Sequence, residues 1–448
     1  MAYTDDVPAV WNAWPLFKSA STSSMDTRLL LVGDSKINPD ATSAPLGHGI
    51  CRTWPVAAWS FISPRSGYTG SPAWMSNGFQ GATVGGATIT RNGRNAGATF
   101  TGGESLLYPV YAIDLSSAGN VTDGSAAAFS QCVLTDNGNY ATANAPFSGV
   151  QCTSRLLYVN NPSGSMVSAR VRSYRQAGTD ASPAYTTVNT TSLTLNTGTA
   201  ALPSYLDVDC GTGANAPGVG IIENSTDETS KCLYLGPPVF YRGTPGSRTT
   251  GFGFCHMATG SYTSENVLAA FGGGGSPTCS VANVRLYLQH AGFTPNFILL
   301  DVGQNTSGTE NTELTAGTQT TYKANMQAIL TQIATVYSGM SAPMPYIILC
   351  DPYATGYTTT HCETKGRALY NLARSNGCGF IDMFQFLNRH GTGTEWYTED
   401  GIHPSGPAVN SHSLTGNGAE CWAATLWAAG FGEYVGRLNS SSVRARMR

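Results

Sequence analysis

The chain has 448 residues, a net charge of −3 and a pI of about 6.2, and nothing in this charge balance points to nucleic acid or an anionic membrane as a partner. Hydrophobic residues make up 41% of the chain and charged residues 11%, which excludes a disordered protein and favours a β-rich, turn-rich fold with an uncharged polar surface. At about 150 residues per domain, this length predicts two or three domains.

The N-terminal segment, residues 1–14, has two early aspartates and lacks the apolar stretch of a signal peptide. No apolar run in the sequence approaches the ~20 residues needed to span a bilayer. We expect an extracellular or virion-surface location. Either the sequence is a mature form with an added Met, or the protein leaves its cell by another route, such as lysis. Residues 29–34, LLLVGD, predict a buried parallel strand, and residues 49–62 predict a helix interrupted by a proline.

Residues 64–250 are rich in Gly, Ser, Thr and Asn, and few helical patterns occur among them. Runs of alternating polar and apolar residues recur there, separated by turn residues: GATITRN, SQCVLTD, SMVSARVRSYRQ, YTTVNTTSLTLN, SYLDVDC and KCLYLGPPVFYRG. This period of two predicts an antiparallel β-sandwich.

After residue 251 the pattern changes to strands that alternate with helices. Strands are predicted at GFGFCHMATG, NFILLDVG, PYIILCDP and GFIDMF. Helices are predicted at TSENVLAAF, with Ser264 as N-cap, and at SVANVRLYLQHAG, with Ser280 as N-cap. Further helices are predicted at TQTTYKANMQAILTQIATVYSG, TKGRALYNLARSNG and residues 418–436. Such alternation predicts a parallel sheet with right-handed crossovers.

The two patterns together predict a discontinuous α/β domain, residues 1–63 and 251–448, interrupted by an inserted sandwich of residues 64–250. Insertion into a surface loop is energetically cheap, because the ends of an inserted domain often lie close together.

Polar residues follow several predicted strands, at the edge where open α/β sheets bind ligands. Alone, each fragment is also a common turn, helix cap or structural histidine. Together they supply the hydroxyl, imidazole, carboxylate and amide groups that acyl transfer needs. The residues are Gly33, Asp34 and Ser35 after the first strand, Gly260 after the second, Gly303, Gln304 and Asn305 after the third, and Asp400 and His403 after the last.

This set resembles the sequence blocks of the SGNH hydrolases, also called GDSL-type esterases. The first block is matched by residues 33–35, the third in part by residues 303–305, and the fifth by residues 400–403; Gly260 is the candidate for the lone glycine of the second. Thr306 stands where the family has Asp, and Lys36 where many members have Leu. The resemblance covers residues 28–62 and 251–437, and it implies a three-layer α/β/α, flavodoxin-like parallel sheet.

The resemblance also implies a Ser-His-Asp mechanism. Ser35 is then the nucleophile, His403 the general base and Asp400 the carboxylate that orients the imidazole. The backbone N–H groups of Ser35 and Gly260 and the side-chain amide of Asn305 form the oxyanion hole. Neither a metal nor an organic cofactor is implied.

The inserted sandwich has two interpretations. Its last run, KCLYLGPPVFYRG, resembles the closing strand of jelly-roll carbohydrate-binding modules, which favours a domain that presents a glycan to the esterase site. Aromatic residues with rings that can stack on sugars are Trp54, Trp59, Trp74, Tyr108 and Tyr185. Alternatively, the sandwich is structural or oligomer-forming, and these aromatic residues belong to its core.

We therefore expect an esterase that removes short acyl groups, O-acetyl in the first instance, from a polysaccharide or other glycan. One alternative is a non-catalytic virion protein, structural or receptor-binding, on a decayed esterase fold; its partners would be other virion proteins or copies of itself. A virion-borne deacetylase would combine the two, and viral haemagglutinin-esterases are an architectural analogy. A lipase is a third alternative, although no long apolar lid segment is evident.

The eleven cysteines include no C-x-x-C pair, so zinc-ribbon spacing is absent. Buried thiols are the simplest interpretation. In an oxidising environment, Cys132–Cys152 and Cys210–Cys232 are candidate disulfides.

Overall fold

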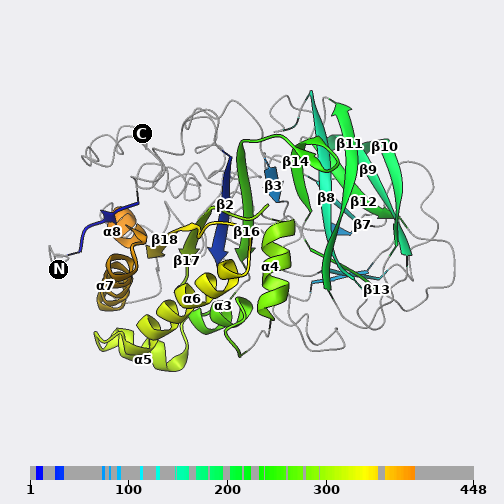
Figure 1. The fold of residues 1–448 in the computed structure, drawn as a ribbon. Helices are drawn as coiled ribbons and strands as arrows, with labels where there is room; N and C mark the ends of the chain where they lie inside the picture. The colour runs from blue at the N-terminus through cyan, green and yellow to red at the C-terminus, as the bar shows by residue number, and fades with distance from the viewer. Residues whose placement is uncertain are drawn as a thin grey trace.

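The structure is a computed structural model, shown in Figure 1. It describes residues 7–13, 26–34, 73–75, 80–81, 88–91, 111–114, 128–131, 147, 149–160, 168–179, 182–194, 202–213, 216–222, 232–236, 238–258, 261–275, 279–291, 293–351 and 359–388. The parallel strands and the helices lie at the left of Figure 1, and the long antiparallel strands lie at the right.

A parallel sheet forms the centre of the α/β part. Its strands lie side by side in the order β19 (Gly379–Asp382), β18 (Tyr346–Asp351), β17 (Phe297–Asp301), β2 (Thr27–Gly33), β16 (Phe252–Ala258) and β3 (Ala73–Met75). A short antiparallel strand, β1 (Val10–Trp11), borders β19. The central strands β2 and β17 are apolar and buried, as expected for strands covered on both faces.

The spatial order of the strands identifies the type of α/β fold. In chain order β2, β16, β17, β18 and β19 are the first to the fifth strand, and across the sheet they run 2-1-3-4-5, with β3 added beside β16. This is the flavodoxin-like order. The predicted α/β fold class is therefore confirmed, and so are the predicted strands at LLLVG and after residue 251.

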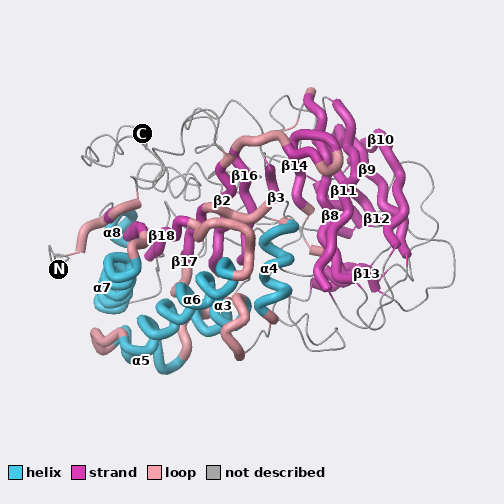
Figure 2. The backbone as a smooth tube through the Cα atoms, in the orientation of Figure 1, coloured by secondary structure: helices cyan, strands magenta, loops and turns pink. Residues whose placement is uncertain are grey.

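Helices flank the parallel sheet (Figure 2). Five of those described pack against one another, and α6 contacts each of the other four: α3 (Ser264–Ala270), α4 (Val281–His290), α5 (Gly308–Thr315), α6 (Thr320–Ser338) and α7 (Thr359–Asn376). The short helix α8 (Met383–Asn388) follows β19 and contacts β18. Within the described ranges, no helix has the length and apolar character that crossing a membrane requires. The helices predicted at residues 49–62 and 418–436 lie outside the described residues.

The helix starts confirm one predicted cap and correct another. Ser280 caps α4, and its side chain accepts a hydrogen bond from the backbone N–H of Asn283. The N-cap of α3 is Thr263 rather than Ser264. Thr263 and Asn266 satisfy each other's backbone N–H groups in a capping box, which places Ser264 one residue inside the helix and leaves its hydroxyl for another bond.

Antiparallel strands form the sandwich that the alternating runs predicted. One sheet contains β14 (Val239–Thr244), β8 (Val150–Asn160), β13 (Cys232–Leu235), β6 (Tyr111–Asp114) and β5 (Thr88–Arg91), with β11 (Leu202–Gly213) paired to β8 and β15 (Ser247–Arg248) paired to β14. The other contains β10 (Ser182–Thr194), β9 (Ser168–Thr179), β12 (Ala216–Ile222), β7 (Ala128–Gln131) and β4 (Gln80–Gly81). The two sheets meet where β8 and β11 contact β9, β10 and β12.

The run KCLYLGPPVFYRG is two strands rather than one. β13 pairs with β6, and β14 pairs with β8 and β3. The two prolines between them, Pro237 and Pro238, lack the N–H groups that a continuous ladder needs, and the strand is interrupted there.

The short strand β3 joins the parallel and the antiparallel regions. It pairs in parallel with β16 on one side and antiparallel with β14 on the other. In the part of the chain that the structure describes, fourteen strands thus belong to a single hydrogen-bonded sheet. The domain boundaries at residues 63/64 and 250/251 stay predictions, but the two regions share backbone hydrogen bonds at this point.

Cys210 is a buried free thiol, so the candidate disulfide between Cys210 and Cys232 is not formed. Its Sγ lies 3.7 Å from the carbonyl oxygen of Val208 and 3.8 Å from that of Gly218, in the core of the sandwich. Cys132, the partner in the other candidate pair, lies outside the described residues.

Candidate active site

The carboxyl ends of three neighbouring strands lie level with one another. Gly33, the last residue of β2, is paired with Ala258 at the end of β16 and with Asp301 at the end of β17. The three strands therefore end side by side, at one edge of the sheet. In the sequence, Ser35, Gly260 and Asn305 come shortly after these three strand ends.

The boundary between β2 and β17 is also the topological switch point of the sheet. On one side of it β2 is followed across the sheet by β16, and on the other side β17, β18 and β19 follow in order. Ligands of open α/β sheets bind in the crevice outside the strand ends at such a point. Asp34, which continues β2, is buried with 1% of its surface exposed.

The loop that continues β17 has a conformation that requires glycine. Gly303 has a φ of 124°, which L side chains rarely adopt. A Cβ atom at this position would lie 2.7 Å from the hydroxyl oxygen of Tyr322 and 3.0 Å from Cδ of Lys365. That tyrosine hydroxyl donates a hydrogen bond of 2.6 Å to the carbonyl oxygen of Val302. The loop is therefore held close to α6 and α7 just before it reaches Asn305.

Asn305 is the predicted oxyanion-hole residue whose side chain the structure describes. It is half-buried, and its Nδ2 donates to the backbone carbonyl oxygen of Tyr262 at 3.4 Å. Tyr262 belongs to the segment after β16, in which the sequence placed Gly260. The loops after β16 and β17 are thus in direct contact.

A buried ion pair lies beneath the loop after β17. Lys365 of α7 and Asp351 at the end of β18 are both fully buried, with Nζ and Oδ1 3.1 Å apart. Nζ also lies 3.5 Å from the carbonyl oxygen of Gly303. Burial by itself lowers the pKa of Lys365, but the carboxylate of Asp351, with further contributions from Cys362 and Asp301, raises it above the ordinary lysine value.

This environment also shifts the neighbouring titratable groups. Burial, followed by the negative charges of Asp351, Glu310 and Asp301, raises the pKa of Tyr322 well above its ordinary value, so the hydroxyl stays protonated and can donate. The pKa of His361 is lowered to about 4, first by burial and second by the charge of Lys365. His361 is therefore neutral at pH 7.

The other predicted site residues fall outside the described part of the chain. These are Ser35, Gly260, Asp400 and His403, and their roles stay predictions. The same holds for the side chains of the five aromatic residues predicted to stack on sugars, although β3 includes Trp74 and β10 includes Tyr185. Of the predicted set, the structure brings together Gly33, Gly303 and Asn305 at adjoining strand ends.

Several polar residues near this edge were not predicted from the sequence. Glu310 is fully buried and receives hydrogen bonds from Ser264 and Asn325. The spacing Ser307-x-x-Glu310 is a capping-box signature that could have identified Glu310. The sequence indicated Ser264 only as a helix cap, and no local pattern indicates its bond to Glu310, the role of Asn325 or the pairing of Lys365 with Asp351.

Across the described ranges, no group of histidine, cysteine, aspartate or glutamate side chains is arranged to hold a metal ion. The arrangement at the strand ends consists of hydrogen-bond donors, buried charges and a tight glycine loop. Such an arrangement suits a site in which an anion or a polarised carbonyl oxygen is stabilised by donors at fixed positions.

Comparison of the sequence with protein-family models and with curated proteins finds no match. Among solved structures, the C-terminal catalytic domain of Streptococcus pneumoniae peptidoglycan O-acetyltransferase A is 20% identical, with a TM-score of 0.26 over 40% of this chain and 79% of that chain. The C-terminal family 22 carbohydrate-binding module of Clostridium thermocellum Xyn10B is 11% identical, with a TM-score of 0.23 over 41% and 96%.

A family two carbohydrate esterase from Cellvibrio japonicus is 9% identical, with a TM-score of 0.20 over 68% of this chain and 86% of that chain. At these scores and identities the likenesses do not assign a family. The fold assignment rests on the strand order and pairing described above.

Proposed function

We propose that this chain is a serine esterase that removes short acyl groups, O-acetyl in the first instance, from a glycan. The observation that carries the proposal is the switch point between β2 and β17. The Gly33-Asp34 end of one strand and the Gly303-Gln304-Asn305 loop of the other lie there as neighbours. Ser35 is the next residue in the chain after Asp34.

The proposed reaction has two steps. The hydroxyl oxygen of Ser35 attacks the ester carbonyl, while His403 accepts its proton and Asp400 orients the imidazole. The bond to the sugar oxygen then breaks, the sugar hydroxyl receives the proton from His403, and an acyl-serine remains. Water, deprotonated by His403, then attacks the acyl carbonyl, the bond to the Ser35 oxygen breaks, and Ser35 recovers its proton from His403 as the carboxylic acid is released.

Asn305 is the proposed oxyanion donor that lies among the described residues, and its hydrogen bonding supports this role. Its amide group carries two N–H donors, and one of them bonds to the carbonyl of Tyr262. The second remains for the negative charge that develops on the substrate oxygen. A donor of this kind typically contributes about 3–4 kcal/mol in the transition state. The backbone N–H groups of Ser35 and Gly260 are the other proposed donors.

The decisive variant is Ser35→Ala. We expect it to abolish hydrolysis of p-nitrophenyl acetate and release of acetate from O-acetylated glycans, with no change in the circular dichroism spectrum. A serine-reactive fluorophosphonate should label the wild type but not the variant. Ser338→Ala, at an exposed serine in the last turn of α6, is the matched control and should keep full activity.

Full activity in Ser35→Ala would refute the nucleophile. An unlabelled and inactive wild type would instead favour the non-catalytic binding protein. A series of p-nitrophenyl esters with lengthening acyl chains separates the proposed enzyme from a lipase, because kcat/KM of a short-acyl esterase should fall as the chain lengthens.

A further inference from the structure

A buried polar cluster connects three helices next to the candidate site. Ser264, the first residue of α3, donates its hydroxyl hydrogen to Oε1 of Glu310 on α5. Asn325 on α6 donates to the same carboxylate oxygen at 2.8 Å and to the hydroxyl oxygen of Ser264 at 3.1 Å. Ser264 and Glu310 are both 0% exposed.

The second oxygen of the Glu310 carboxylate has a different partner. Oε2 accepts a hydrogen bond of 3.1 Å from the backbone N–H of Ser307, the N-cap of α5. Glu310 therefore binds the loop after β17 through Oε2. Through Oε1 it binds α3, the helix that follows the loop after β16. Both acceptors are occupied, as a buried carboxylate requires.

These bonds close a ring around the two loops. Asn305 donates to the carbonyl of Tyr262. Ser264, which is two residues after Tyr262, donates to Glu310. Glu310 accepts from Ser307, which is two residues after Asn305. Each loop is thus held to the other at two places, one at the edge of the site and one buried behind it.

A helix cap alone does not account for this arrangement. A capping box uses only one carboxylate oxygen, which accepts from the backbone N–H of the N-cap, whereas here the carboxylate is fully buried and its other oxygen binds α3 and α6. Burying a carboxylate carries a large desolvation cost, which hydrogen bonds from three donors offset. The bonds beyond the cap join α5 to α3 and to α6.

We propose that Glu310 is a positioning residue: with Ser264 as its partner, it sets the position of the Asn305 amide in the oxyanion hole. This inference rests on the proposed esterase function. Glu310 does not touch the substrate; it acts through Asn305. A displacement of about 1 Å at a reacting centre lowers a rate about 100-fold, so loosening the ring reduces kcat while the binding of ground-state substrate changes little.

Two variants open the ring in different ways. Ser264→Ala removes the hydroxyl that bonds α3 to α5 and leaves the cap of α5 in place. Glu310→Gln keeps the size of the side chain but replaces one of its two acceptor oxygens with a donor. For both, we expect kcat on p-nitrophenyl acetate to fall about 10- to 100-fold with KM within about 2-fold of the wild-type value.

Glu313→Gln is the matched control, because it makes the same chemical change on the same helix. Glu313 binds the backbone N–H of Thr321 at 2.7 Å and its hydroxyl at 3.0 Å, at the start of α6 and away from the loop after β16. It should lower thermal stability without lowering kcat, when all variants are assayed well below their melting temperatures.

A double-mutant cycle with Asn305→Ala tests the route of the effect. If Glu310 acts through Asn305, Ser264→Ala and Glu310→Gln should lower kcat little further when Asn305 is already alanine. Equal loss in the two backgrounds would overturn the inference, as would wild-type kcat in both single variants. Should Glu310→Gln fail to fold, Ser264→Ala completes the cycle alone.

The two proposals fail in different ways. An inactive wild type that fluorophosphonate does not label refutes the esterase, and the positioning role with it. A wild type that is active and dependent on Ser35, combined with unaffected kcat in Ser264→Ala and Glu310→Gln, refutes the positioning role alone.

Discussion

At the scale of single residues, Gly303 shows why the loop at this edge of the sheet tolerates few substitutions. Its backbone conformation excludes most side chains, and the space where a Cβ would stand is filled by Tyr322 and Lys365. Both neighbours are themselves buried and bonded, so neither can move away easily. The conformation of one glycine thus determines where the chain goes next, toward Asn305.

Gly303→Ala is expected to reduce both stability and activity. Gly317→Ala is the matched control, because Gly317 also has a positive φ of 79°, but a Cβ atom added there would meet no other atom within 4 Å. Left-handed strain alone costs roughly 1–2 kcal/mol. The clash at Gly303 should add at least about 1 kcal/mol to that loss, measured by urea unfolding.

Activity separates the same two variants. A shift of the loop moves Asn305, so Gly303→Ala should lower kcat on p-nitrophenyl acetate about 100-fold, whereas Gly317→Ala should keep it. Equal losses of stability and of kcat in both variants would show that the close approach at Gly303 is unimportant.

At the scale of elements, the parallel strands and α7 are joined by charge as well as by apolar packing. The buried Lys365 of α7 pairs with Asp351 of β18 directly behind the loop after β17. Such a pair is weak evidence for high stability, because desolvation of two charges offsets most of their attraction. The ion pair instead fixes the position of α7, because the two charges meet only at one placement and one rotation of the helix against the sheet.

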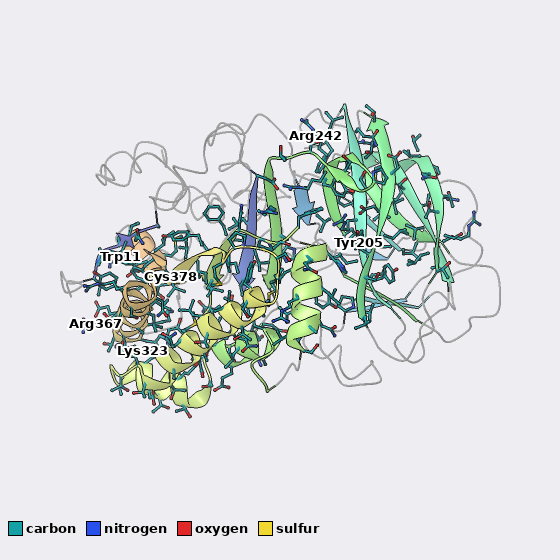
Figure 3. All side chains as sticks on the ribbon, in the orientation of Figure 1. Trp11, Tyr205, Arg242, Lys323, Arg367 and Cys378 are labelled. Carbon is teal, nitrogen blue, oxygen red and sulfur yellow. The ribbon has the colours of Figure 1, made fainter. Side chains whose placement is uncertain are left out.

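Lys365→Met should therefore destabilise the protein by about 3–5 kcal/mol, because the carboxylate of Asp351 loses its buried counter-charge. Lys323→Met is the matched control on an exposed face of α6, labelled in Figure 3, and should change stability by less than about 0.5 kcal/mol. Urea unfolding measures both.

Adding Asp351→Asn to Lys365→Met removes the remaining charge and should restore part of the lost stability. A loss below about 1 kcal/mol in Lys365→Met, or no recovery in the double variant, would contradict the assignment of a buried ion pair.

At the scale of the whole molecule, the sandwich is attached to the α/β part through side chains as well as through β3. Arg155 of β8 binds Asp207 of β11 with two hydrogen bonds of 2.8 Å and donates to the carbonyl of His290 at the end of α4 at 3.1 Å. Its guanidinium lies 4.0 Å from the ring centroid of Tyr205 and 4.5 Å from that of Phe293. Figure 3 shows Tyr205 at this boundary, beside α4.

The position of Arg155 predicts that the two regions unfold together and that this residue couples them. Arg155→Met should lower stability by about 3 kcal/mol, because it breaks a buried ion pair, and should broaden or split the calorimetric transition. Arg170→Met, at an exposed arginine of β9, is the matched control. A single sharp transition in Arg155→Met at the wild-type temperature would show that β3 alone couples the regions.

The sequence by itself determined the main strands of the α/β part, the helices α3, α4, α6 and α7, and the fold class. Apolar runs, period-two alternation and helix caps are local patterns, and β2, β16, β17, β18 and β19 appear where these patterns predicted them. It also placed Asn305 at a strand end. Where the sequence was wrong or silent, neighbouring residues decided the outcome: Thr263 rather than Ser264 caps α3, the run KCLYLGPPVFYRG divides into β13 and β14, and β8 and α5 were not predicted.

Only the tertiary structure decided how these pieces meet. The use of β3 to join two sheets, the bond between Ser264 and Glu310 across 46 positions, and the burial of Lys365 against Asp351 have no local signature. Each depends on which distant residues share a desolvated space, where an unmatched charge or donor costs several kcal/mol. Local propensity acts within a few residues, whereas the cost of burying a polar group depends on partners from anywhere in the chain.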